Sequence, residues 1–230
     1  GNPDGLTCGE AEIRRIAEVA RRHEVIVLSD EIYGKLDHRA RHVSIARHYP
    51  EGTILSTGLS KWCGAGGWRL GVFVFPERLV WLRDAMAALA SETYTSTSAP
   101  IQHAAVRAFK GGQEIERYLA HARRILAALG CWSAECLRRA GARVHDPEGA
   151  FYVFPDFEPL RERLAARGVT GGRELAERLL RDAGVALLPG EAFERPPAEL
   201  TLRIAYVHFD GAAAITASES LPLSEPLGED

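Results

Sequence analysis

An acidic pair follows the apolar run Val25–Leu28, where Ser29 leads directly into Asp30 and Glu31. Acids at the carboxyl end of a buried strand lie where α/β folds bind ligands. One chemistry open to Asp30 is magnesium binding in a nucleotide hydrolase, but that function needs a GxxxxGK[ST] phosphate loop, which the sequence lacks. The other interpretation is an aspartate that caps the next turn. The neighbouring motifs must decide between the two.

A lysine stands among small and hydroxyl residues in Ser56-Thr57-Gly58-Leu59-Ser60-Lys61, and Gly66-Gly67-Trp68-Arg69-Leu70-Gly71 follows. Most lysines are solvated surface charges, so Lys61 alone indicates little. The small residues before it leave room for a phosphate, and the guanidinium of Arg69 suits bidentate phosphate binding. The glycines do not match GxGxxG, which argues against a dinucleotide site.

Arg203 lies inside the apolar pattern Leu200–Val207. Burying an arginine without a partner is costly, so we expect a carboxylate partner or a ligand at this position. No acid adjacent in sequence supplies one. The aromatic residues Trp68 and Phe193 are most simply packing residues.

The elements that position these residues alternate between strands and helices in the first half of the chain. Thr7 and Glu10 predict a capping box that starts a helix, and Ile13–Ala20 has its apolar residues at helical spacing. Val25–Leu28 is typical of a strand buried on both faces. Two further strands are predicted at 54–55 and 70–75. This order indicates an α/β layer fold with a largely parallel sheet.

The second half has an α+β pattern. Helices are predicted at 77–90, 99–110, 113–140, 160–167 and 172–183, a short hairpin at 142–145 and 151–154, and strands at 185–188 and 200–207. Gly111-Gly112 stops a helix and is our predicted boundary. The domains are then 1–111 and 112–230, and we expect the tail at 211–230 to fray.

Composition restricts the function classes. The chain has 230 residues, a net charge of −3 and interspersed charges, so nucleic-acid binding is not expected. No apolar run approaches the ~18 residues that span a bilayer, and the N-terminus does not resemble a signal peptide. Four cysteines without a CxxC pair and without an export signal favour reduced thiols and a cytoplasmic location. No metal-binding spacing occurs.

Taken together, the motifs resemble those of class I/II aminotransferases, which are pyridoxal-5′-phosphate (PLP) enzymes of fold type I. The matching segments, in the order and spacing of that family, are Asn2-Pro3-Asp4-Gly5, Ser29-Asp30-Glu31-Ile32-Tyr33, Ser60-Lys61 and Gly67-Trp68-Arg69-Leu70-Gly71. Leu202–Tyr206 resembles the family's C-terminal arginine strand, and Leu188-Pro189-Gly190 with Phe193 resembles the loop before it. The likeness covers about residues 1–208. It implies a partial large PLP-binding domain in 1–111 and a smaller α+β C-terminal domain in 112–230.

The resemblance also implies a role for each matched residue. Lys61 is the catalytic lysine that forms the Schiff base and then moves the proton. Asp30 would keep the pyridine nitrogen protonated. The other implied cofactor ligands are Asn2 and Tyr33 for the ring oxygen and Ser60 and Arg69 for the phosphate, with Thr57 a weaker candidate.

Arg203 matches the arginine that binds the substrate α-carboxylate. The implied reaction transfers an amino group between an amino acid and a 2-oxo acid in a cytoplasmic homodimer, with no nucleic acid, membrane or metal involved. PLP-dependent lyases share these motifs and remain an alternative. A ligand-sensing domain of a transcription regulator is another, and upstream sequence would discriminate it. Because the chain opens at the Asn-Pro motif, we expect the family's N-terminal part, with its phosphate loop, to be missing.

Overall fold

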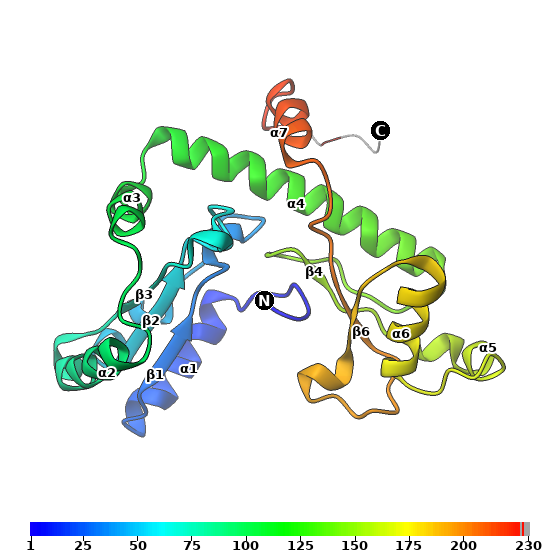
Figure 1. The fold of residues 1–230 in the computed structure, drawn as a ribbon, viewed down its shortest axis with the longest axis horizontal. Coiled ribbons are helices and arrows are strands. Elements are labelled where there is room, and N and C mark those ends of the chain that lie inside the picture. Colours follow the sequence, from blue (N-terminus) through cyan, green and yellow to red (C-terminus); the bar gives the residue numbers. More distant parts are fainter. Residues whose placement is uncertain (226, 228–230) are drawn as a thin grey trace. The chain divides into compact units, whose positions relative to one another are not determined.

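The computed structural model describes residues 1–225 and 227. The chain forms two compact units, and the division falls between Leu119 and Ala120. We call Cys8–Leu119 the lysine unit, because it contains Lys61. Gly1–Thr7 together with Ala120–Asp230 is the arginine unit, which contains Arg203. Figure 1 shows the elements of each.

The lysine unit contains a three-stranded sheet in the order β1-β2-β3. β1 (Val27–Asp30) is parallel to β2 (Thr53–Gly58), with Asp30 opposite Ser56. β3 (Gly71–Val74) is antiparallel to β2, and Gly71 lies opposite Gly58. The segment 59–70, which includes Lys61 and Arg69, therefore connects two strands that are hydrogen-bonded to each other.

β1 begins two residues later than predicted, and the end of α1 (Glu10–Arg22) explains the shift. Glu24 adopts a left-handed conformation, with φ of 52°, and the backbone N–H of Val25 donates to the carbonyl of Ala20 at 2.9 Å. Because this N–H bonds to a carbonyl in the last turn of the helix, it cannot pair with a neighbouring strand of the sheet. The ladder starts at Val27, and Asp30 becomes the last residue of the strand.

α1 covers one face of this sheet (Figure 1) and supplies most of a small core. Its buried residues Ala17 and Ala20 pack with Ile45 and Tyr49, and Val27 packs against the same cluster. Gly52 lies against the ring of Tyr49, where a Cβ would overlap the ring. Leu28, on the other face of β1, is 61% exposed. The expectation of a strand buried on both faces is therefore wrong for the described residues, because only one face has a covering layer.

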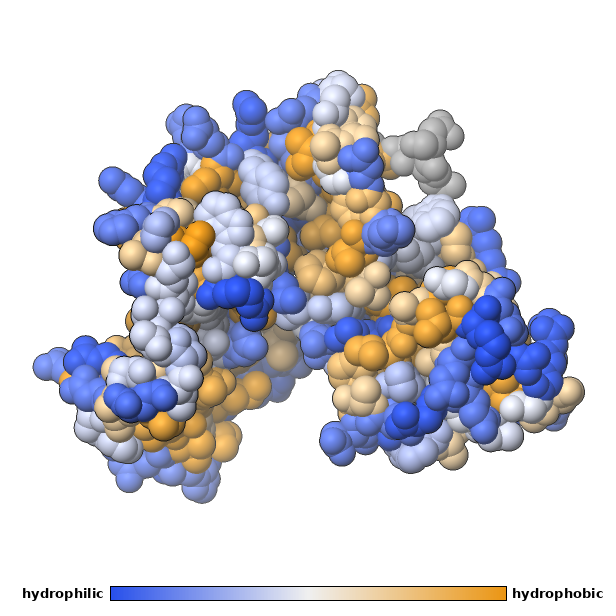
Figure 2. Space-filling view, viewed as in Figure 1, coloured by the Kyte–Doolittle hydropathy of each residue, from blue (hydrophilic) through white to orange (hydrophobic). Residues whose placement is uncertain are grey.

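Three helices follow the sheet. They are α2 (Val80–Thr93), α3 (Ala99–Lys110) and α4 (Gln113–Arg139). The predicted bounds of α3 are confirmed, and those of α4 differ by one residue. α2 starts three residues late because 77–79 form a 3-10 turn. Its apolar residues Trp81 and Leu89 are exposed, and apolar colour is visible on the surface of this unit in Figure 2.

The arginine unit contains a second sheet in the order β4-β6-β5. β6 (Leu202–Ala205) is central and antiparallel to both β4 (Tyr152–Val153) and β5 (Leu188–Pro189). α5 (Arg161–Ala165) and α6 (Gly172–Ala183) complete the α+β pattern predicted for this half of the chain. Its core joins Leu175 and Ala176 of α6 to Leu200 and Leu202.

The predicted hairpin at 142–145 and 151–154 is wrong in its pairing. Arg143 pairs with Asp156 in an isolated bridge, and β4 pairs with β6 instead. The turn between these two segments bonds to the N-terminal segment instead. The carbonyl of Gly5 accepts the N–H groups of Glu148 and Gly149 at 2.9 and 3.0 Å. A contact between residues more than 140 positions apart has no signal in the local pattern.

The same N-terminal segment overturns the predicted capping box. The hydroxyl and backbone N–H of Thr7 both donate to the carboxylate of Glu148, at 3.0 and 3.1 Å. α1 instead has Gly9 at its N-cap, whose N–H donates to the side chain of Glu12 at 2.9 Å. The box is therefore displaced by two residues, because Thr7 belongs to the arginine unit.

The tail starts with α7 (Gly211–Glu219), whose N-cap Asp210 accepts hydrogen bonds from Ala212 and Ala213 at 3.0 Å each. The predicted fraying falls partly on residues 226 and 228–230, which lie outside the described residues. None of the described helices is both long enough and apolar enough to cross a membrane.

Candidate active site

Asp30 and Tyr33 occupy one tight turn at the carboxyl end of β1. One carboxylate oxygen of Asp30 accepts the backbone N–H of Ile32 at 3.1 Å, and the N–H of Gly34 donates to the carbonyl of Glu31 at 2.9 Å. Tyr33 is the N-cap of the 3-10 helix Gly34–Leu36, and Leu36 is buried. The turn therefore fixes the direction of both predicted cofactor residues, with the Asp30 carboxylate exposed.

Lys61 lies in the loop that leaves the carboxyl end of β2. The buried side chains of Leu59 and Trp62 flank Ser60 and Lys61, and the N–H of Leu59 donates to Leu70 O at 3.4 Å across the base of the loop. These apolar anchors hold the loop while Lys61 itself stays half-buried. Because Leu59 and Trp62 are buried on either side of this pair, packing sets the direction in which the Lys61 side chain leaves the backbone.

The structure brings Lys61 and Tyr33 together. The Lys61 amine lies 5.9 Å from the centre of the Tyr33 ring, within the range of cation–π contacts. β1 and β2 are parallel neighbours, so the segments after them share one edge of the sheet. Asp30, Tyr33 and Lys61 therefore lie at or just after the carboxyl ends of two neighbouring strands.

Arg69 and Ser60 lie in the same loop as Lys61. Arg69 adopts the left-handed conformation, with φ of 54°, and its Nη1 donates to the carbonyl of Gly66 at 2.8 Å. Its side chain is exposed. Thr57, the weaker candidate, lies within β2 opposite Val72.

Arg203 lies in the arginine unit between two aromatic rings. Its guanidinium carbon is 4.6 Å from the ring centre of Tyr152 and 5.0 Å from that of Phe193. Nη1 donates to the side-chain oxygen of Asn2 at 2.9 Å. Nε is buried and makes no hydrogen bond within the described part of the chain. Among the described residues no carboxylate forms an ion pair with Arg203, so the expected acid partner is absent there.

This arrangement joins Asn2 to Arg203, a pair separated by 201 positions in the sequence. Asn2 reaches β6 because Gly5 and Thr7 attach the N-terminal segment to Glu148. Two of the seven predicted site residues are thus in contact in the arginine unit, and the other five lie in the lysine unit. Phe193, expected only to pack, contacts the cation directly.

A group of polar residues beside the Asp30 turn was not predicted. The carboxylate of Glu31 accepts from Ser29 Oγ at 3.0 Å and Ser44 Oγ at 2.6 Å, and His42 Nε2 lies 2.8 Å from it. Burial alone would raise the pKa of Glu31, but the hydrogen bonds from His42 and Ser44 outweigh it and lower that pKa. The spacing of Ser29 and Glu31 on one strand face was the only local signal, and nothing adjacent points to His42.

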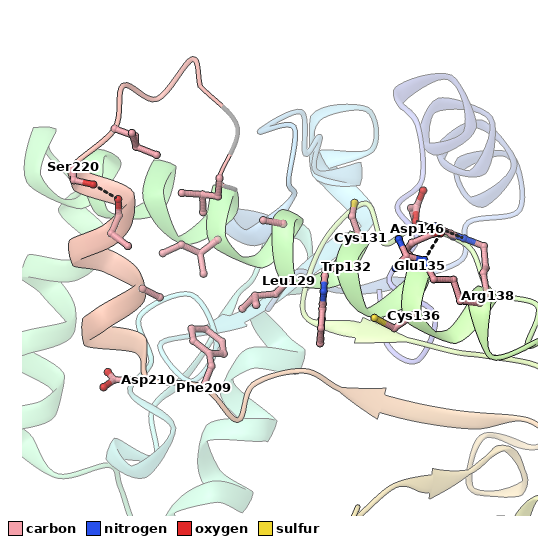
Figure 3. A pocket seen from close by; sticks show the side chains of 17 residues that line it. Leu129, Cys131, Trp132, Glu135, Cys136, Arg138, Asp146, Phe209, Asp210 and Ser220 are labelled. Atoms are coloured by element: carbon pink, nitrogen blue, oxygen red, sulfur yellow. Dashed lines mark hydrogen bonds and ion pairs between the residues drawn. The ribbon is translucent and has the colours of Figure 1, made fainter. Parts of the chain in front are cut away.

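A cavity of about 850 Å³ lies between α4 and α7 in the arginine unit (Figure 3). Its lining includes Trp132, Phe209 and Leu129, with an ion pair of Arg138 and Asp146 at 3.0 Å on its rim. None of the seven predicted site residues lines it. The cavity therefore does not coincide with the residues predicted to bind the cofactor or the substrate.

Comparisons with known proteins agree with the motifs. The sequence profile described as "Aminotransferase class I and II" matches residues 1–212. The aspartate aminotransferase of Geobacillus stearothermophilus is 35% identical over 199 residues, which are 85% of this chain and 49% of that protein. This chain thus spans about half the length of such a relative.

Solved structures give the same result for the fold. The Thermus thermophilus aspartate aminotransferase with maleate matches with a TM-score of 0.77 and 29% identity, over 96% of this chain and 53% of that one. The aromatic aminotransferase from Pyrococcus horikoshii OT3 matches with a TM-score of 0.77 and 28% identity, over 95% of this chain and 56% of that one. These matches confirm the predicted partial fold type I architecture. With the profile covering nearly the whole chain, this protein belongs to the class I and II aminotransferases.

Proposed function

We propose that this chain carries the lysine and the substrate-binding arginine of a PLP-dependent aminotransferase, which transfers an amino group between an amino acid and a 2-oxo acid. Members of this family use PLP. The observation that carries the proposal is the placement of the Lys61 amine 5.9 Å from the ring of Tyr33, which lies in the turn that begins at Asp30.

The residues of the lysine unit fit this cofactor. PLP supplies an aldehyde that condenses with amines and an electron-withdrawing ring. Asp30 offers an exposed carboxylate, which would hold a proton on the ring nitrogen. Ser60 and Arg69 offer a hydroxyl and a guanidinium for the phosphate, and Tyr33 offers a hydroxyl for the ring oxygen. Asn2, the other residue expected at the ring oxygen, lies in the arginine unit, where its side-chain oxygen accepts from Arg203. Lys61 would hold the cofactor through its amine, and the same amine would move the proton at the substrate α-carbon.

Arg203 supports the substrate half of the proposal. Its partners Tyr152, Phe193 and Asn2 are all neutral, so the positive charge is not cancelled by the described residues. The buried Nε has no hydrogen-bond acceptor among them. A planar carboxylate that accepts from two guanidinium nitrogens is the ligand that such a group binds best. The α-carboxylate of an amino acid or 2-oxo acid has that shape.

The wider assignments belong to the same proposal. We infer a homodimer in the cytoplasm, and the four cysteines, none of which forms a disulfide in the structure, are compatible with a reducing compartment. The division of the chain at Gly111-Gly112 into a large-domain part and a small domain remains a prediction.

The decisive experiment maps the cofactor to one lysine. The chain has three lysines, Lys35, Lys61 and Lys110. The protein that carries this chain at its natural length is loaded with PLP, reduced with borohydride and digested. We expect the label on Lys61. Lys61→Ala should retain weak PLP binding, lose the label, and lower the transfer rate by about 10²–10⁴-fold, the contribution of a general acid–base group.

Lys35→Ala is the matched control. Lys35 lies in the same unit, 5.3 Å from the Trp62 ring and 3.9 Å from Glu116, so its replacement removes a neighbouring cation of similar setting. We expect the label and the rate to stay as in the parent. A label on Lys35, or no label in a protein that binds PLP, contradicts the proposal.

A further inference from the structure

The carboxylate of Glu31 is the centre of a polar group, the Glu31 cluster, formed by Ser29, Glu31, His42 and Ser44. The side chain of Glu31 is only 10% exposed, so its charge is largely removed from water. Both serine hydroxyls donate to one of its oxygens, and His42 contacts the other. A buried carboxylate needs such partners, and here all of them come from neighbouring segments of the lysine unit.

The backbone of Glu31 connects the same residue to the sheet and to the turn. Its N–H donates to the carbonyl of Ser56 in β2 at 2.8 Å, and its carbonyl accepts the N–H of Gly34 at 2.9 Å. Successive residues of a strand point to opposite faces, so Ser29 and Asp30 in β1 face opposite sides of the sheet. The Glu31 side chain, just after the strand, accepts from Ser29 Oγ at 3.0 Å and therefore lies on the Ser29 side, away from the Asp30 carboxylate.

His42 supports this turn from outside. A Cβ placed on Gly34 would lie 2.7 Å from a carbon of the His42 ring, which shows that the ring lies directly against the backbone of the turn. Tyr33 is the residue before Gly34, and Asp30 is the residue before Glu31. Movement of the Glu31 cluster would therefore shift both residues that are proposed to hold the ring of the cofactor.

We propose that Glu31, supported by His42, is a positioning residue that sets the directions of Asp30 and Tyr33 in the PLP site. This inference rests on the proposed function. The reason is geometric. One carboxylate oxygen of Asp30 accepts the backbone N–H of Ile32, which ties the carboxylate to the turn. The direction of the other oxygen therefore depends on the turn, which Glu31 holds in position. Misplacement of a reacting or binding group by about 1 Å can lower a rate about 10²-fold.

Three variants test the proposal in the natural-length protein. Glu31→Ala removes all three of the hydrogen-bonding contacts that join the Glu31 side chain to Ser29, His42 and Ser44. Glu31→Gln keeps the length and one acceptor oxygen but loses the charge beside His42, and it serves as the second variant if Glu31→Ala does not fold. Glu51→Gln is the matched control, because Glu51 is also paired, with Arg21 at 2.6 Å, but lies on the exposed surface away from the turn.

Two readouts are independent of turnover. Hydrogen exchange of the cofactor-free protein at the amides of Ile32, Gly34 and Leu36 should be about 10-fold faster or more in Glu31→Ala, and less accelerated in Glu31→Gln. With PLP bound, the pH midpoint of its absorbance change should shift in both Glu31 variants, because the ring then contacts a displaced Asp30 or Tyr33. The transfer rate should fall by up to about 10²-fold. Glu51→Gln should match the parent in all three.

The outcomes separate the two proposals. A Glu31→Gln protein with parental amide exchange and a parental pH midpoint overturns the positioning role. Lower thermal stability with an unchanged pH midpoint also overturns it, because that result assigns Glu31 to the fold alone. If the parent protein binds no PLP at Lys61, the proposed function fails first. Faster exchange at the turn in the cofactor-free variants would still show that Glu31 holds the turn in place.

Discussion

The lysine unit and the arginine unit each contain a charged side chain that is at least partly buried, and the partners of the two charges differ. Glu31 in the lysine unit has three hydrogen-bonding partners, including a histidine that can carry the opposite charge. Arg203 in the arginine unit has two aromatic rings and one amide oxygen, all neutral, and its Nε lacks a partner among the described residues.

The difference agrees with the two proposed roles, in which Glu31 holds a turn in position and Arg203 keeps a donor for a substrate carboxylate. A buried carboxylate with a hydrogen-bond partner on each of its two oxygens gains little from a further partner. A guanidinium in contact with two rings is held in place, since cation–π contacts stabilise the charge without cancelling it. Its remaining donors are then available to an anion. The comparison predicts that changes at Arg203 affect ligand binding more than stability.

The largest effect is expected for Arg203→Lys. Lysine keeps the charge but loses the planar pair of donors, so substrate affinity should weaken by about 1–3 kcal/mol, the scale of a charge-assisted hydrogen bond. PLP binding and the melting temperature should change little. The measurement compares amino-acid affinity, the PLP spectrum and thermal unfolding with the parent at natural length. A lost fold with unchanged substrate affinity would make Arg203 a structural residue.

A smaller effect is expected when one ring of the stack is removed. Phe193→Leu keeps an apolar side chain of similar size but ends the contact 5.0 Å from the guanidinium carbon. Substrate affinity should fall by about 0.5–1 kcal/mol, as for one partly exposed cation–π contact. Phe157→Leu, in a residue that packs on the core of the same unit, is the control. Equal losses of affinity in both variants would show that general packing, and not the stack, sets the position of Arg203.

The smallest effect is expected at the exposed pair of Arg21 and Glu51. The hydrogen bond from Arg21 lowers the pKa of Glu51 to about 2. A lowered folded-state pKa contributes stability above the unfolded value of about 4.5, and the contribution is lost as pH falls toward 2. Because the pair is solvent-screened, Glu51→Gln should barely change the melting temperature at pH 7. The parent and the variant should converge further in acid. A large difference at pH 7 would show that exposed pairs also hold this fold.

Helices were the most predictable elements, because their signals are local. α3 begins with a proline near its N-terminus and ends at Gly111, and its predicted bounds are those observed. β1 was predicted two residues early, because the run Val25–Leu28 does not reveal that Val25 is used to end α1. The predicted hairpin was wrong for a related reason, because the N–H groups of Glu148 and Gly149 in its turn donate to the distant carbonyl of Gly5.

Some residues of the candidate site could likewise be named from the sequence, and others could not. The resemblance to the family named Asp30, Tyr33 and Lys61 as site residues, and the structure places Asp30 at the end of β1, Tyr33 in the turn after it and Lys61 in the loop after the neighbouring strand β2. His42 and Tyr152 carry no such signal. A histidine in an irregular segment and an aromatic in a short strand are both ordinary, and only their contacts with Glu31 and Arg203 set them apart.

The amino-acid sequence by itself determined the family and the alternation of strands and helices, and it named Lys61 as the proposed cofactor lysine, because these depend on motifs and periodicities that extend over a few residues at a time. Only the tertiary structure decided which polar groups are satisfied. Asn2 meets Arg203 across 201 positions, and Ser44 meets Glu31 across 13. Such contacts arise when distant segments pack together, and the free energy of a buried charge depends on those partners and not on its neighbours in the chain.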